Sequence, residues 1–346
     1  QDNANHPDPV RLAGRITRAF LGIRLDCAQC HDHPFAPWVK ADFEGLSAFF
    51  GQTHLGFKGI YDNKSEYELK DRKTQEYRVV APSVPFSQNL LSEQGTRRQQ
   101  LAAWITHPQN PYFARAAVNR VWALLFGRPL VEPVDNLQTE GPSPAALQIL
   151  ADDFTANGYD LRRLIRLMAS TEVFRMDSST SGGDADPNDK AWAVIPMTRL
   201  RPDQVAGSIV QASSVGTINA ETHLLGRLIR FGEKNDFVTR YGDDGEDEFD
   251  GRGGTIPQRL LMMNGKMVRE NLSGSPNSTC RRIAWLAPND LSAVESAYLA
   301  VLTRRPTPEE AEYFEAALAE NSEKRAERIQ DLFWALINST EFSWNH

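Results

Sequence analysis

The stretch Cys27-Ala28-Gln29-Cys30-His31 constrains this chain more than any other part of its sequence. Two cysteines separated by two residues and followed at once by a histidine form the C-x-x-C-H pattern of covalent haem attachment. Each thiol can form a thioether with one vinyl group of the porphyrin, and the histidine can ligate the iron from below. The motif predicts haem c held through Cys27 and Cys30, with His31 as the proximal iron ligand.

The same segment leaves two other kinds of site open. Cys27, Cys30, His31 and His33 place four possible metal ligands within seven residues, and zinc binds sulfur and nitrogen in a tetrahedron. The adjacency of Cys30 and His31 is awkward for one tetrahedral ion, because structural zinc sites usually join two separated ligand pairs. A disulfide or a structural thiol pair is the remaining alternative.

The other contacts of a haem have weaker candidates in the sequence. His33 is too close to His31 to reach the opposite face of the ring, so we expect it to bond a haem propionate or to pack beside Pro34. Arg120 is a candidate propionate partner because guanidinium binds carboxylate through two hydrogen bonds; an arginine paired with a neighbouring acid is the alternative. Although methionines at helical spacing are typical of core packing, the distal iron-ligand candidates are Met262, Met263 and Met267, with His54 and His107 as alternatives.

Length and composition bound the remaining possibilities. A chain of 346 residues predicts two or three domains, and 41% hydrophobic with 24% charged residues is typical of globular proteins. The net charge of −7 gives no reason to expect nucleic acid as a partner, and no apolar run is long enough to span a bilayer. Phosphate-binding glycine loops, a nucleophile elbow and H-E-x-x-H are absent from the sequence, so nucleotide and hydrolase chemistry have no support.

Apolar residues at helical spacing dominate the chain and predict a mainly α fold, with a small helical c-type haem-binding N-terminal part and a larger multi-helix C-terminal region. In the connector predicted between these parts, at 58–93, Tyr77–Val80 is the best strand candidate. An acidic, glycine-rich loop at 242–254 lacks the spacing of an EF-hand, which favours a solvated loop over a calcium site. The predicted segments are a haem-attachment region at 1–57, a connector at 58–93, a helical domain at 94–180 and a second helical region at 181–346.

Two segments share landmarks and predict two related helix pairs. Ser-Pro at 143–144 opens the first pair, which closes on Ser-Thr-Glu-Val-Phe at 170–174. Thr-Pro at 307–308 opens the second, which closes on Ser-Thr-Glu-Phe at 339–342. Two copies indicate a duplicated packing unit rather than a solenoid, which needs more repeats to bury its core.

Several blocks carry a family resemblance. Residues 20–26, followed by Cys-Ala-Gln-Cys-His-Asp-His-Pro-Phe and Trp38, resemble the end of the planctomycete-type cytochrome domain. The block from Asn110 to Val131 resembles the planctomycete-specific domain of unknown function that usually follows it. Further segments resemble the same second domain: Leu161–Arg175, Arg199–Pro202, Ala300–Pro308 and Asn338–Phe342.

This resemblance implies a secreted or periplasmic haem protein, with Cys27 and Cys30 in the attachment role and His31 in the proximal role. It implies no substrate. Family members usually carry a longer region before the motif, so we expect a redox protein partner or another chain that completes the haem pocket. The chain does not open on a basic and apolar signal segment, so we expect that an export signal has been removed or that the chain is a fragment of a longer precursor.

The sequence therefore predicts an exported c-type haem protein that acts in electron transfer or as a redox partner. A peroxidase-like haem oxidoreductase is the first alternative; it needs an open iron face and a distal acid or base. The second alternative is a structural or interaction protein whose C-x-x-C-H-x-H segment holds a metal or is vestigial.

Overall fold

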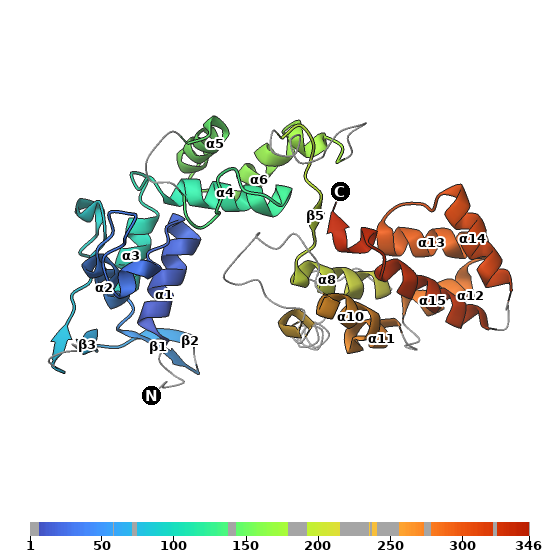
Figure 1. Cartoon of the computed structure of the whole chain (residues 1–346), viewed down its shortest axis with the longest axis horizontal. Helices are drawn as coiled ribbons and strands as arrows, with labels where there is room; N and C mark the ends of the chain where they lie inside the picture. The colour runs from blue at the N-terminus through green and yellow to red at the C-terminus, as the bar shows by residue number, and fades with distance from the viewer. Residues whose placement is uncertain are drawn as a thin grey trace. The chain divides into compact units, whose positions relative to one another are not determined.

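The computed structural model describes residues 7–57, 59–70, 75–137, 143–178, 192–214, 235, 237–240, 256–272, 278–320 and 324–345. The chain divides into two compact units, Gln1–Met176 and Asp177–His346. Helices predominate in both, which confirms the mainly α prediction (Figure 1). Within the described residues, no helix is long and apolar enough to cross a membrane. The acidic loop at 242–254 lies outside the described residues, and the finer division into four segments stays a prediction.

The first helix of the chain begins and ends at residues that favour those positions. Asp8 caps α1 (Pro9–Ile16) by accepting a hydrogen bond from the backbone N–H of Val10 at 2.9 Å, and a proline opens the helix. A π-helical turn, Thr17–Leu21, continues it to Gly22. Gly22 adopts a φ of +61°, and a Cβ there would lie 2.9 Å from Leu137 Cγ, so both conformation and space require glycine.

A short 3₁₀ turn, η2, and a following helix form the part of the first unit that carries the motif. Their apolar side chains join one buried cluster with α1 and α3, and Trp104 and Phe49 are among its fully buried members. The remaining described elements of this unit are η2 (Asp26–Gln29), α2 (Lys40–Ala48), β1 (Thr53–Gly56), β2 (Gly59–Asp62), β3 (Glu68–Lys70), β4 (Tyr77–Val79), η3 (Gln88–Leu90), α3 (Arg97–Ile105), α4 (Phe113–Phe126), α5 (Ala145–Ala156), α6 (Leu161–Ala169) and η4 (Val173–Arg175).

Two small hairpins lie in the predicted connector and directly before it. Strands β1 and β2 pair antiparallel with Leu55 opposite Ile60, and β3 pairs with β4 with Leu69 opposite Arg78. Strand β4 confirms the strand predicted from Tyr77 onward. Each sheet has two strands, so neither can enclose a core of its own.

The second unit is built around a single apolar cluster to which all its larger helices contribute. Ile209, Val294 and Phe333 are fully buried in that cluster. A two-stranded pairing of β5 with β6 ties the start of the unit to its end. The described elements are β5 (Thr198–Arg199), α8 (Pro202–Ser213), α10 (Ile256–Asn264), α11 (Lys266–Leu272), α12 (Thr279–Leu286), α13 (Asp290–Leu302), α14 (Pro308–Ala319), α15 (Arg325–Ile337), η6 (Glu341–Ser343) and β6 (Trp344–Asn345).

The two predicted helix pairs are present. Helices α5 and α6 form the first and α14 and α15 form the second, and each pair packs together. A single 3₁₀ turn follows each pair, η4 in the first unit and η6 in the second. The shared Ser-Thr-Glu landmark therefore marks the same local event in both units, the end of a helix pair at a tight turn.

Candidate functional site

The motif cysteines lie on one short turn whose inner side is anchored in the core. Turn η2 carries Cys27, and Cys30 follows directly as its C-cap. Ala28, between them, is fully buried, and so is Leu25 just before the turn. Both cysteines are exposed and their thiols are free. The two buried residues thus anchor the backbone of the turn in the core, and both cysteines lie at the surface.

The neutral ring of His31 is held in one tautomer. Its Nδ1 lies 2.7 Å from the backbone carbonyl oxygen of Asp32. A carbonyl oxygen can only accept a hydrogen bond, so Nδ1 is the donor. In the neutral ring this leaves the lone pair on Nε2, which is the arrangement of an imidazole that ligates a metal while its other nitrogen is oriented by a carbonyl.

The loop after the motif is braced by its own polar groups. The Asp32 carboxylate accepts from the backbone N–H of Lys40 at 2.9 Å, which ties the loop to the start of α2. His33 donates its backbone N–H to the carbonyl of Trp38 at 2.8 Å, and its Nδ1 accepts from the N–H of Phe35 at 3.1 Å. The His33 ring thus stabilises the loop, a role the sequence did not suggest. Its expected contact with a propionate stays a prediction, through Nε2.

An ion network fixes the other side of the motif turn. Asp26, directly before Cys27, accepts from Arg18 Nε at 2.8 Å. Arg18 also lies 3.8 Å from Asp135, and Arg24 binds Asp135 through Nε and a terminal nitrogen at 2.9 and 2.7 Å. Only 10% of the Asp135 side chain is exposed. Charge-assisted, two-pronged contacts at a nearly buried carboxylate are the stronger kind of ion pair.

A buried asparagine positions the loop that presents Asp135. Asn119 on α4 is fully buried; it donates to the carbonyl of Val131 at 2.8 Å and accepts from its N–H at 3.0 Å. Further along the same loop, Leu137 donates its N–H to the carbonyl of Gly22 at 2.7 Å. The segment after α4 is therefore hydrogen-bonded to the residues that directly precede the motif.

Asp135, Arg18 and Arg24 support the site without being predictable from the local sequence. Arg24 and Asp135 are 111 residues apart, and nothing in either local pattern points to the other. The available signal was weak: two charged residues, Arg24 and Asp26, directly precede the motif in an otherwise apolar stretch.

Arg120 lies on α4 and is half-buried. Burial lowers the pKa of Arg120, and the nearby Asp135 carboxylate partly offsets that effect. Its charge thus interacts with that of Asp135. A neighbouring acid was the alternative to a propionate partner. A propionate contact stays a prediction.

The three methionines belong to the second unit. Met262 and Met267 are buried members of its core cluster, whereas Met263 is largely exposed. The backbone carbonyl of the exposed Met263 accepts a hydrogen bond from the indole N–H of Trp334 at 3.0 Å. Core packing thus accounts for two of the three side chains, and distal ligation stays a prediction.

The groups on and beside the motif turn are of the kinds that a covalently attached haem would need. Among the described residues, which include the whole C-x-x-C-H-x-H segment, no three His, Cys, Asp or Glu side chains converge in a way that could hold a metal ion. Two outward thiols on one turn and an adjacent imidazole with Nε2 available are instead the separate bonding groups that a covalently attached porphyrin needs.

Two family models match the chain, in the order that the resemblance predicted. Residues 1–55 match PSCyt2, a protein of unknown function (DUF1549), and residues 97–230 match PSD1, a protein of unknown function (DUF1553). The motif turn lies in the first match, and the loop that carries Asp135 lies in the second. No curated protein and no solved structure is detectably similar to the chain.

Proposed function

We propose that this chain belongs to an exported, periplasmic or extracellular c-type haem protein that transfers electrons to or from a redox partner. The observation that carries the proposal is the His31 ring, whose Nδ1 is bonded to the Asp32 carbonyl and whose Nε2 is left for a metal, beside two exposed thiols on one turn. When bound, haem supplies one-electron chemistry by cycling its iron between two oxidation states.

Each motif residue has a distinct task in this proposal. Cys27 and Cys30 hold the group covalently, so that it stays in place in a site with few covering side chains of its own. His31 ligates through Nε2, and the Asp32 carbonyl keeps the proton on Nδ1 and so orients the ring. The Asp135 network keeps the turn in register with the core below it.

Exposure of the motif loop supports electron exchange with another protein. Cys27, Cys30 and His31 are exposed, and the neighbouring Phe35 has 93% of its surface in contact with solvent. An exposed apolar side chain beside a redox group favours a transient protein contact, because small, partly apolar patches are typical of such encounters. A partner that covers this loop also completes the haem environment.

Covalent attachment is tested on the exported protein by cysteine replacement. We expect the wild-type protein to carry pigment that survives acid–acetone extraction, and the double variant Cys27→Ala, Cys30→Ala to carry none. Cys280→Ala is the matched control, because that thiol is buried in the second unit and should not affect the pigment. Covalent pigment in the double variant would refute the proposal. A colourless wild-type protein would move the function to a structural or metal-bound role.

Iron ligation is tested by a matched pair of histidine variants. His31→Asn should leave the pigment attached but change the reduced absorbance spectrum, because the proximal nitrogen is lost. His33→Asn removes a neighbouring imidazole, yet asparagine can still accept a hydrogen bond from the N–H two residues on, as the His33 ring does. We expect its spectrum to match the wild type. Equal spectra for both variants would exclude His31 as the ligand.

A further inference from the structure

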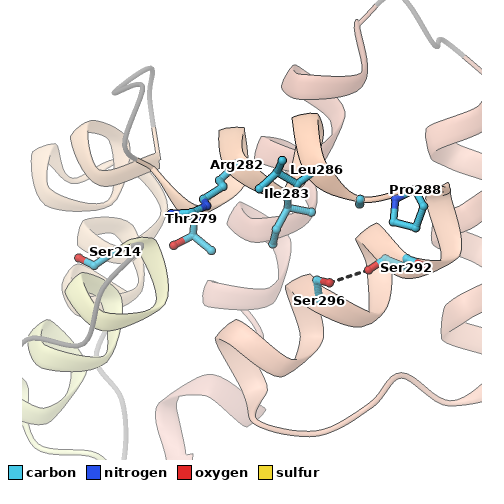
Figure 2. A pocket seen from close by; sticks show the side chains of 9 residues that line it. Ser214, Thr279, Arg282, Ile283, Leu286, Pro288, Ser292 and Ser296 are labelled. Atoms are coloured by element: carbon cyan, nitrogen blue, oxygen red, sulfur yellow. Dashed lines mark hydrogen bonds between the residues drawn. The ribbon is translucent and has the colours of Figure 1, made fainter.

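A groove in the second unit is separate from the motif and has a defined polar end. Its volume is about 430 Å³, within the range of roughly 300–1,000 Å³ that small-molecule sites occupy. It lies along α12 and the start of α13, with the end of α8 at one side (Figure 2). Its lining includes Thr279, Arg282, Ile283, Leu286, Ser292 and Ser296.

Thr279 and Arg282 supply unused hydrogen-bond donors. They are three residues apart on α12 and therefore neighbours on one helix face. The Thr279 hydroxyl is shielded from solvent and has no hydrogen-bond partner among the described residues, which is a costly state for a polar group. Across the described part of the chain, the Arg282 guanidinium makes no ion pair or side-chain hydrogen bond. By contrast, the adjacent Arg281 stacks at 5.1 Å on Trp285.

Two of the three serine hydroxyls that line the groove are already committed as donors. Ser296 donates to the backbone carbonyl of Ser292 at 2.7 Å, and Ser214 donates to that of Val210 at 2.6 Å. These two hydroxyls retain only acceptor capacity toward a ligand. Besides the Ser292 hydroxyl, the donors that the groove offers an anion are thus Thr279 and Arg282.

The same face of α12 continues as apolar surface. Ile283 and Leu286 follow Arg282 by one and four residues, and 67% of Leu286 is exposed. Pro288 extends this surface past the end of the helix (Figure 2). Removing the exposed leucine and the partly exposed isoleucine from water lowers the free energy of a complex with an apolar ligand.

We propose that this groove binds a small carboxylic acid with an apolar tail. The carboxylate pairs with the Arg282 guanidinium and accepts the Thr279 hydroxyl proton, and the tail lies along Ile283 and Leu286. A guanidinium without a protein partner selects an anion, and the apolar continuation selects a ligand whose other end is hydrocarbon. The proposal does not depend on the haem assignment, because every group it uses lies in the second unit.

Calorimetric titration of the whole chain with three matched eight-carbon probes tests the class of ligand. Octanoate, octanol and octylammonium share one tail and differ in the head group. We expect octanoate to bind about tenfold more tightly than octanol, as one charge-assisted pair provides, and octylammonium to bind most weakly because it meets a like charge. Equal affinity for octanoate and octanol, or no octanoate binding, would overturn the proposal.

Single substitutions then test the two donors. Arg282→Gln should lower octanoate affinity to that of octanol, whereas Arg281→Gln, on the neighbouring position, should leave it unchanged. Thr279→Val should lower it by about threefold while leaving the unfolding temperature equal or higher, since the hydroxyl it removes has no partner. Unchanged octanoate binding in Arg282→Gln would refute the site, and equal losses in both arginine variants would reduce it to non-specific charge attraction.

Discussion

The two regions that hold cysteine show how surroundings decide the chemistry of one side chain. On turn η2, Cys27 and Cys30 are exposed, and the residue between them is buried instead. On α12, Cys280 is 2% exposed, and burial raises the pKa of its thiol to about 12. A thiolate is the reactive form of cysteine, so desolvation leaves Cys280 inert. The first region presents sulfur for chemistry, and the second uses sulfur to fill a core.

The two regions also differ in what holds them. Cys280 lies in a continuous apolar cluster to which several helices contribute, so no single contact is decisive for its position. The motif turn has two buried apolar residues on its inner side. Its position otherwise depends on ion pairs between arginines near the turn and Asp135, which is distant in the sequence. The exposed site is thus fastened by directional contacts, and the buried one by packing.

The largest expected effect is on thiol reactivity. In the haem-free chain under reducing conditions, Cys27 and Cys30 should react with iodoacetamide at least about a hundredfold faster than Cys280, because the latter must wait for an opening of the core. Mass spectrometry of timed aliquots measures the three rates. A Cys280 rate close to the other two would break the contrast between the regions.

Removing the Asp135 charge should produce the next largest effect. Asp135→Asn leaves Arg24 and Arg18 without their shared carboxylate, and we expect the first unit to lose about 2–3 kcal/mol of unfolding free energy. Denaturant unfolding followed by tryptophan fluorescence measures the loss. The control is Asp152→Asn, because Asp152 is exposed and its contact with Gln148 survives the change. Equal stabilities of the two variants would show that the network is not needed.

A more exposed ion cluster in the second unit sharpens the same point. Arg304 binds Glu310 at 2.8 and 2.9 Å and Glu341 at 2.6 and 2.8 Å, and so joins the start and the end of the α14–α15 pair. Each of these side chains keeps about a quarter to a third of its surface exposed, so solvent screens the pairs.

Arg304→Gln should therefore lower the unfolding free energy of the second unit by only about 1 kcal/mol. Arg305→Gln provides the control, since Arg305 is 76% exposed and makes one long ion pair. Denaturant midpoints of the two variants measure the difference. A loss in Arg304→Gln as large as that in Asp135→Asn would contradict the importance of burial.

The smallest expected effect is a dependence on acid. Hydrogen bonds from Arg304 hold the pKa of Glu310 at about 2, below its ordinary value of 4.5. The unfolded chain takes up the proton first as the pH falls, so this pair stabilises the fold above about pH 4.5 and loses that contribution down to about pH 2. Comparing unfolding midpoints at pH 6 and pH 3 should show a smaller drop for Arg304→Gln than for the wild type. Equal drops would mean that Glu310 is not the group responsible.

Local signals in the sequence were sufficient to predict much of the fold. The boundaries of α1, α3 and α6 follow from the caps Asp8, Thr96 and Asp160, and Gly127 ends α4 at a φ of +71°. These boundaries are encoded locally, because a cap involves residues within a few positions of each other. The motif itself is equally local, so its thiols and histidine were identified without any knowledge of the fold.

The supports of the motif are not local. Asp135 reaches Arg24 only because Asn119 holds the intervening loop by its backbone and Leu137 packs against Gly22. In the same way, the sequence showed three methionines at helical spacing but not that two of them face the core of the second unit.

The sequence by itself determined the helical elements, the related helix pairs and the reactive groups of this protein, because each is encoded by residues close together along the chain. Only the tertiary structure decided which cysteines are exposed, which carboxylate binds the arginines beside the motif turn and which arginine on α12 makes no ion pair among the described residues. Burial and ion pairing depend on residues that folding brings together from distant parts of the chain, and a local sequence pattern does not show which distant residues come into contact.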